Sequence, residues 1–78
     1  MNITVYTKPM CPQCDATKRH LDRMGVEPTV VDVTVDPAAL ATVRAMGYAA
    51  VPVVVCGDVH WAGFRPDLLD GLVECAAT

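Results

Sequence analysis

Two cysteines stand three positions apart in the segment Cys11-Pro12-Gln13-Cys14. Thiols at this spacing can exchange electrons by opening and closing a disulfide, provided that one of them reacts as the thiolate. Three interpretations are open: a redox-active pair, half of a metal site, or two buried and inert cysteines. We favour the redox pair, because neither the other cysteines nor the two histidines stand at a spacing that would complete a zinc site.

The residues around the pair predict how it would react. Pro12 suits the first turn of a helix, where an N–H is not needed, so Cys11 is expected at a helix N-terminus. The free N–H groups and the helix dipole favour an anion there, and hence the thiolate of Cys11. Cys14 lies one turn further along the same face. We therefore expect Cys11 to attack a disulfide and Cys14 to resolve the mixed disulfide that forms.

Length, composition and charge limit the class of protein. With 78 residues the chain is expected to form one domain, residues 1–78, and 53% hydrophobic residues suit a small core. A net charge of −3 with six scattered Lys and Arg residues argues against nucleic-acid binding. No apolar run reaches the roughly 18 residues of a membrane helix, and the N-terminus does not resemble a secretory signal. We expect a cytoplasmic protein that binds neither membranes nor nucleic acid.

Alternating strands and helices are predicted to position the cysteines. The predicted order is βαβαββα, with strands at 2–6, 28–35, 53–56 and 59–61 and helices at 12–24, 37–46 and 66–76. The valine-rich strand at 28–35 is expected to be covered on both faces, as strands of parallel sheets are. A C-x-x-C motif after the first strand of such a chain is typical of thioredoxin-like proteins. The predicted fold class is α/β, with a four-stranded mixed sheet flanked by three helices.

Several residues outside the motif are predicted to be structural. The last helix is expected to turn its apolar residues inward, namely Leu68, Leu69, Leu72 and Cys75. Cys56 and Cys75 lie in apolar runs and are expected to be buried and unreactive. We expect His20 to face solvent and His60 to be structural.

Four segments together resemble the NrdH-redoxin family. They are Thr7-Lys8-Pro9-Met10-Cys11-Pro12-Gln13-Cys14, Gly47-Tyr48, Val51-Pro52-Val53-Val54 and His60-Trp61-Ala62-Gly63-Phe64-Arg65-Pro66-Asp67. The resemblance implies a thioredoxin/glutaredoxin fold, reduction by thioredoxin reductase at the expense of NADPH, and electron delivery to a class Ib ribonucleotide reductase and other protein disulfides. We expect a monomer with no bound cofactor beyond the redox-active Cys11–Cys14 disulfide.

The Val51-Pro52 step has two interpretations. A trans proline at the start of a strand is the ordinary expectation, since only about 5–6% of X-Pro bonds are cis. In thioredoxin-like folds, however, a proline at this place is cis and faces the dithiol. The resemblance therefore implies a cis Pro52, with the backbone of Val51 free to pair with an extended substrate.

The segment after the fourth strand bears on the choice of reductant. Glutathione-binding glutaredoxins resemble this chain up to that strand, but continue with Gly-Gly and acidic residues that receive the amino group of glutathione. Here Arg65 would repel an ammonium group, and Pro66 offers no N–H to a carboxylate. We expect weak glutathione binding, with Gly63, Arg65 and Asp67 shaping the turn.

The remaining candidate residues are predicted to contact partners. Trp61 and Phe64 either cover the core or form an exposed apolar patch that docks proteins beside the dithiol. Lys8 either stabilises the thiolate of Cys11 or is simply exposed. Pro12 and Gln13 stand between the cysteines, within reach of any partner.

The sequence thus predicts a thiol–disulfide oxidoreductase that acts as an electron carrier. A glutathione-dependent dithiol glutaredoxin is one alternative, since Pro12 is more like glutaredoxins than the Met or Val common in the NrdH family. The family also usually has Ser where Ala62 stands. A C-x-x-C metal chaperone is the alternative of another class, but its motif would place methionine where Pro9 stands, and such chaperones end in a strand.

Overall fold

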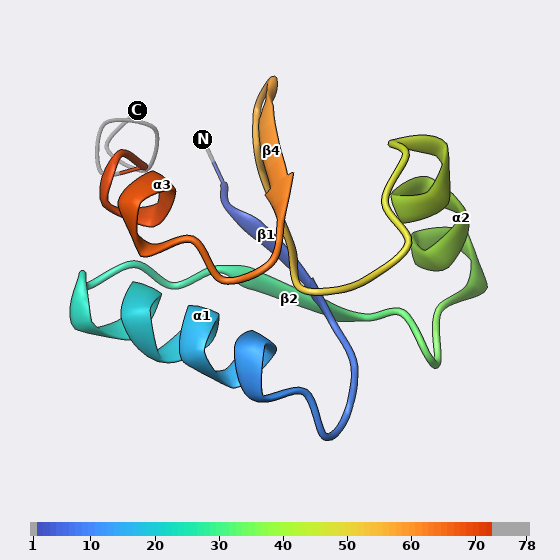
Figure 1. Cartoon of the computed structure of the whole chain (residues 1–78), viewed down its shortest axis with the longest axis horizontal. Coiled ribbons are helices and arrows are strands. Elements are labelled where there is room, and N and C mark those ends of the chain that lie inside the picture. Colours follow the sequence, from blue (N-terminus) through green and yellow to red (C-terminus); the bar gives the residue numbers. More distant parts are fainter. Residues whose placement is uncertain (1, 73–78) are drawn as a thin grey trace.

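The computed structural model describes residues 2–72 and contains the seven elements in the predicted order (Figure 1). They are β1 (Thr4–Thr7), α1 (Pro12–Arg23), β2 (Thr29–Asp32), α2 (Pro37–Ala45), β3 (Val53–Cys56), β4 (Val59–Ala62) and α3 (Pro66–Asp70). The strands form one sheet in the order β2-β1-β3-β4. β1 pairs with β2 in parallel and with β3 antiparallel, and β3 pairs with β4 antiparallel. The predicted α/β class with a four-stranded mixed sheet is confirmed.

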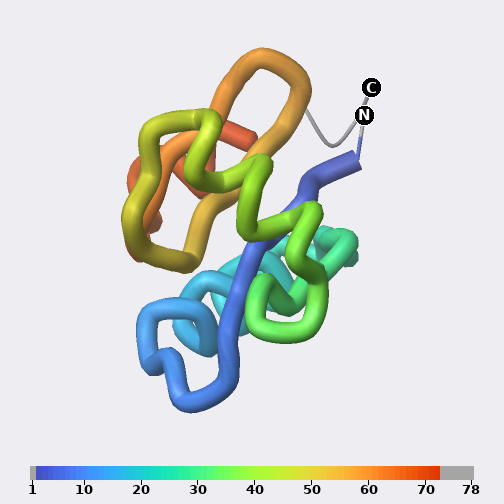
Figure 2. Tube along the Cα trace, turned by 90° about the vertical axis from the view of Figure 1, so that its right-hand side faces the viewer, coloured from blue at the N-terminus to red at the C-terminus, as the bar shows by residue number. Residues whose placement is uncertain are grey.

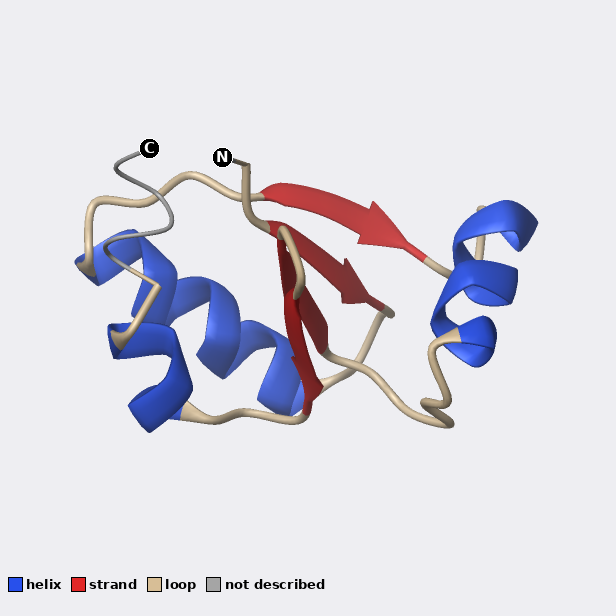
Figure 3. Ribbon diagram, turned by 90° about the horizontal axis from the view of Figure 1, so that it is seen from above, coloured by secondary structure: helices blue, strands red, loops and turns tan. Residues whose placement is uncertain are grey.

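The helices cover the two faces of the sheet unequally. In Figure 3, α1 and α3 lie on one side of the strands and α2 lies alone on the other side. α1 and α3 also contact each other. Because successive residues of a strand point to opposite faces, Val53 and Val54 of β3 enter different clusters of the core. Each face of the sheet therefore has its own apolar layer.

The helix starts follow from the sequence. Pro12 and Pro37 occupy the first turns of α1 and α2. The carboxylate of Asp36 accepts a hydrogen bond from the backbone N–H of Ala39 at 3.1 Å and thereby caps α2. At α1 the capping position is taken by Cys11, which brings a sulfur to the helix N-terminus.

The larger apolar layer lies between the sheet and the pair α1 and α3. It contains the buried side chains of Ile3, Val5, Leu21, Val54, Cys56, Trp61, Leu69 and Leu72. The inner face of α1 is formed by the buried residues Cys14, Thr17 and Leu21. The smaller layer, under α2, contains Val33, Ala39, Val43 and Val53.

The prediction for β2 is wrong in length and in environment. β2 is an edge strand of four residues, with Thr29 and Val30 exposed rather than covered on both faces. The chain leaves the strand at Asp32, whose carboxylate accepts hydrogen bonds from the N–H and hydroxyl of Thr34. These bonds lower the pKa of Asp32. Valine content predicted the strand, but the strand order decides which strand has a neighbour on each side.

The prediction for the last helix is partly wrong. Leu69 and Leu72 are buried as predicted, but Leu68 is 37% exposed, because it lies on the outer side of α3. The helix is also shorter than predicted, because α3 ends at Asp70 and residues 71–72 form a turn. The predicted helical residues 73–76, and the predicted burial of Cys75, lie outside the described residues. Cys56 is buried, as predicted. No helix within residues 2–72 is long and apolar enough to cross a membrane.

Candidate dithiol site

Cys11 and Cys14 form a disulfide at the N-terminus of α1, with their Cα atoms 5.2 Å apart. Cys14 is fully buried, whereas Cys11 is 7% exposed. The backbone N–H of Cys14 donates to the sulfur of Cys11 at 3.1 Å. An N–H aimed at this sulfur also favours the thiolate after reduction, because a charge-assisted hydrogen bond is stronger than a neutral one. Of the two sulfurs, that of Cys11 is thus both better stabilised as an anion and closer to solvent.

The loop before β3 lies beside this sulfur. The Val51–Pro52 peptide bond is cis, as the resemblance implied. The carbonyl oxygen of Val51 lies 3.9 Å from the sulfur of Cys11, and Pro52 is buried. A segment 40 residues away in the sequence therefore forms one wall of the site.

The loop after β4 forms a second wall and is tied to both other segments. The N–H of Gly63 donates to the carbonyl oxygen of Pro52 at 2.8 Å. The next N–H, that of Phe64, donates to the side-chain oxygen of Gln13 at 3.3 Å. Gly63 has a φ of 90°, which allows two consecutive amides to point at different segments. Gln13 thus connects the dithiol helix to the loop, a contact that sequence reasoning missed because nothing local pairs positions 13 and 64.

The aromatic residues do not form a common exposed patch. Trp61 is 7% exposed and packs into the larger apolar layer. Of the two interpretations, it therefore covers the core and is not part of an exposed docking patch. Its ring faces that layer because Trp61 pairs with Val54 on the side of the sheet that α1 and α3 cover. Phe64 is half-buried against the same layer, with its ring 6.0 Å from that of His20. The exposed apolar side chain beside the dithiol is instead that of Met10.

The charged candidates lie at the margins of the site. Lys8 is exposed and lines a small cavity of about 160 Å³ together with Val51 and residues of α2. Arg65 forms an ion pair with Asp67 at 3.1 Å. The two hydrogen bonds from Arg65 lower the pKa of Asp67. The ion pair between Arg65 and Asp67 therefore stabilises the start of α3, where these residues were predicted to shape a turn.

Both histidines bridge elements. Nε2 of His20 lies 2.7 Å from the carboxylate of Asp70 on α3. The prediction that His20 faces solvent is wrong, because its side chain is only 18% exposed, although Asp70 itself is exposed. His60 contacts the hydroxyl of Tyr48 at 2.6 Å, which joins β4 to the loop after α2. These partners are 50 and 12 residues apart, respectively. No signal in the local sequence could have paired them.

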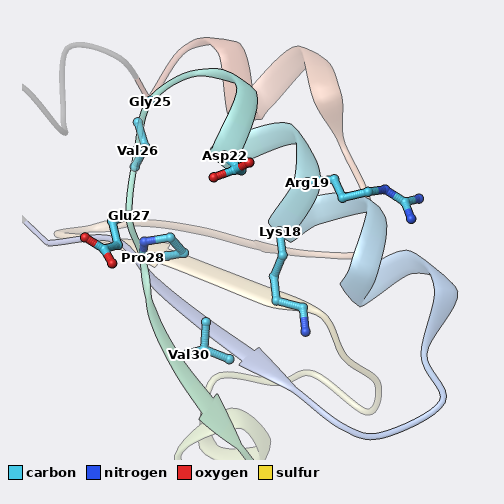
Figure 4. A pocket seen from close by; sticks show the side chains of 8 residues that line it. All are labelled: Lys18, Arg19, Asp22, Gly25, Val26, Glu27, Pro28 and Val30. Atoms are coloured by element: carbon cyan, nitrogen blue, oxygen red, sulfur yellow. The ribbon is translucent and has the colours of Figure 1, made fainter.

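A larger pocket, of about 660 Å³, lies away from the dithiol (Figure 4). It opens between the second half of α1 and the segment 25–30, with side chains of both charges, Lys18, Arg19, Asp22 and Glu27, around it. It contains none of the predicted site residues. Within residues 2–72 no group of three or more His, Cys, Asp or Glu side chains could hold a metal ion.

Comparison with known proteins agrees with this geometry. The glutaredoxin family model matches residues 3–61. The glutaredoxin-like protein NrdH of Salmonella typhimurium is 47% identical over 72 residues, covering 92% of this chain and 89% of the relative. A protein of Mycobacterium phage L5, the gene 56 protein, is 39% identical over 75 residues, covering 92% of this chain and 72% of the phage protein.

Among solved structures, NrdH-redoxin from Escherichia coli superposes with a TM-score of 0.89 at 43% identity, covering 92% of this chain and 95% of the other. The thioredoxin-like protein BC3987 follows with a TM-score of 0.84 at 33% identity, covering 92% of this chain and 100% of the other. The chain therefore belongs to the glutaredoxin family, as a glutaredoxin-like redox protein of the NrdH type.

Proposed function

We propose that the protein is a cytoplasmic dithiol electron carrier that thioredoxin reductase reduces and that passes electrons to a class Ib ribonucleotide reductase and other protein disulfides. The observation that carries the proposal is the Cys11–Cys14 disulfide at the N-terminus of α1, with Cys11 the more accessible cysteine. Support also comes from the relatives, since the E. coli NrdH-redoxin is described by its thioredoxin-like activity profile.

The reaction transfers two electrons in two exchanges. The thiolate of Cys11 attacks one sulfur of the partner disulfide, forms a mixed disulfide and releases the other partner sulfur as a thiolate, which takes up a proton. Cys14 then loses its proton to solvent and attacks the sulfur of Cys11. The Cys11–Cys14 bond forms as the bond between Cys11 and the partner breaks, and the released partner thiolate takes up a proton, so the partner leaves as a dithiol. The dithiol of the reductase reverses these steps, so NADPH is consumed at the reductase and the carrier needs no bound cofactor.

The structure of the loop after β4 favours the proposal that the partners are proteins rather than glutathione. The N–H groups of Gly63 and Phe64 both donate to groups within the protein, so they are engaged before any ligand carboxylate arrives. Pro66 has no N–H to offer. The carboxylate of Asp67 in the same turn is already paired with Arg65 at 3.1 Å, so it is engaged by a cation before a glutathione ammonium group could reach it.

A coupled assay of NADPH oxidation tests the proposal. The oxidised protein is offered either to thioredoxin reductase or to glutathione with glutathione reductase, and absorbance at the NADPH band is followed. We expect rapid turnover with thioredoxin reductase and little with glutathione. Turnover with glutathione alone would assign the protein to the glutathione-dependent glutaredoxins instead.

A further inference from the structure

Met10 combines two unfavourable features at one position. Its side chain is 98% exposed, so a large apolar group is left in water. Its backbone has a φ of 56°, and Met10 is the one non-glycine residue with a positive φ among those the structure describes. A side chain with a Cβ fits this region of conformational space poorly. Such an outlier points to a function when nothing in the local fold requires the residue.

The turn that contains Met10 does not call for methionine. Pro9 followed by a residue with positive φ is the pattern of a type II turn, whose third position is usually glycine or asparagine. Either residue would relieve the backbone and remove the exposed apolar surface. The side chain of Met10 therefore has no role in holding the turn.

The location of Met10 indicates what covers it. Met10 immediately precedes Cys11, and any partner must bring its own sulfur to the sulfur of Cys11 for exchange to occur. The protein surface around Cys11 is then covered by that partner. A protein partner covers a patch of many residues, whereas a small thiol covers little beyond the sulfur. A flexible, polarisable thioether suits an apolar contact with more than one partner.

We propose that Met10 is a docking residue, whose side chain enters an apolar pocket beside the redox-active cysteine of a partner protein. This inference rests on the proposed function in so far as thioredoxin reductase is taken as one such partner. It assigns partner binding to a residue that lies outside the dithiol and outside the loop after β4.

The test compares three substitutions at one position. Met10→Asn and Met10→Gly remove the side chain and suit the positive φ, whereas Met10→Leu keeps an apolar side chain of similar size. The oxidised variants are titrated against thioredoxin reductase, and their melting temperatures are measured. We expect Met10→Asn and Met10→Gly to raise KM roughly three- to ten-fold with little change in kcat, as loss of an interface anchor does. We expect the melting temperature of Met10→Asn to rise, and Met10→Leu to retain a KM near that of the wild type.

The control variant removes another exposed apolar side chain, that of Val59, which begins β4 at the hairpin turn. Figure 2 shows this turn, in orange, at the opposite end of the molecule from the dithiol loop, in blue. Val59→Ala should leave KM unchanged. An equal KM for Met10→Asn and the wild type, or an equal rise for Val59→Ala, would overturn the inference.

A second measurement separates this inference from the proposed function. If thioredoxin reductase does not turn over the wild type, the proposed function fails, and the variants are compared in insulin reduction with dithiothreitol as reductant. The rate with insulin is divided by the rate with hydroxyethyl disulfide, a small substrate. We expect this ratio to fall for Met10→Asn and to recover for Met10→Leu. An unaltered ratio would leave Met10 without a docking role.

Discussion

Cys11 and Cys14 differ in how far solvent reaches them and in what surrounds their sulfurs. The sulfur of Cys11 accepts the N–H of Cys14 and lies near the carbonyl of Val51, while Cys14 is fully buried. A partner disulfide can therefore approach Cys11 but not Cys14 without a change in the fold. The difference in exposure follows from position on the helix, because the capping residue projects from the end and the residue one turn later lies on the inner face.

Replacing the buried cysteine should trap the reaction at its midpoint. In Cys14→Ser the mixed disulfide at Cys11 has no internal thiol to resolve it, so a covalent complex with a protein disulfide should accumulate. Non-reducing electrophoresis and mass spectrometry of the linked peptides would show the bond at Cys11. Cys11→Ser, the matched variant, should give no complex. A complex joined through Cys14 in that variant would reverse the assigned roles.

At the scale of elements, the ends of strands and helices bring the site together. The end of β1 leads into the dithiol loop, Pro52 immediately precedes β3, and Gly63 immediately follows β4. Because β1 and β3 are antiparallel neighbours, the end of the former and the start of the latter lie at one edge of the sheet. The same antiparallel rule brings the end of β4 to that edge. The sheet therefore gathers three segments that are far apart in the chain.

The start of α3 should depend on pH through Asp67. Its pKa is lowered by hydrogen bonds from Arg65, so the carboxylate binds a proton less readily in the folded than in the unfolded chain. Its contribution to stability is then present above the unfolded pKa of about 3.9 and is lost as the pH falls through the lower, folded pKa. The stability difference between the wild type and Asp67→Asn, from urea unfolding, should be largest near pH 7 and shrink below about pH 4.

Arg65→Gln removes the donor instead of the acceptor and provides the complementary variant. At neutral pH, Arg65→Gln should lower the free energy of unfolding by about as much as Asp67→Asn does, since both variants break the same ion pair. If the difference in free energy of unfolding between the wild type and Asp67→Asn grew as the pH was lowered, the assigned direction of the pKa shift would be wrong.

At the scale of the whole molecule, two apolar layers and a few long-range contacts hold the helices on the sheet. His20 with Asp70 joins α1 to α3, and His60 with Tyr48 joins β4 to the loop after α2. Both contacts are exposed at the surface, so each contributes less to the free energy of unfolding than a buried apolar side chain of the two layers does. The larger layer thus has to keep α3, and with it the loop at residues 63–64, against the dithiol helix.

Adjacent leucines of α3 offer a matched test of this layer. Leu69 is fully buried, whereas Leu68 is 37% exposed. Leu69→Ala should lower the free energy of unfolding by about 2–5 kcal/mol, and Leu68→Ala by roughly 1 kcal/mol or less. Urea denaturation followed by the fluorescence of Trp61, the single tryptophan, would measure both. Equal losses for the two variants would show that the described orientation of α3 is wrong.

The dithiol, the order of elements and the caps of α1 and α2 could be predicted from the sequence, because they depend on neighbours in the chain. Cys11 and Cys14 lie within one helical turn, and Pro12 and Asp36 act on their own helix ends. The strand β3 was predicted to the residue for the same reason. The cis peptide bond before Pro52 was predicted from the family resemblance, because the general preference of X-Pro bonds would have favoured trans.

Which side chains surround the dithiol, and which are buried, depends on how the elements pack against one another. Trp61 lies in the core and β2 at the edge, because strand order sets which face and which strand are covered. Gln13 contacts Phe64, and His20 contacts Asp70, across some 50 residues of chain. Such contacts depend on how the sheet and helices pack, which local periodicity does not encode. The thiol chemistry of the pair follows from the spacing of Cys11 and Cys14 in the chain, whereas the packed fold buries Cys14, leaves Cys11 slightly exposed and leaves Met10 exposed beside it.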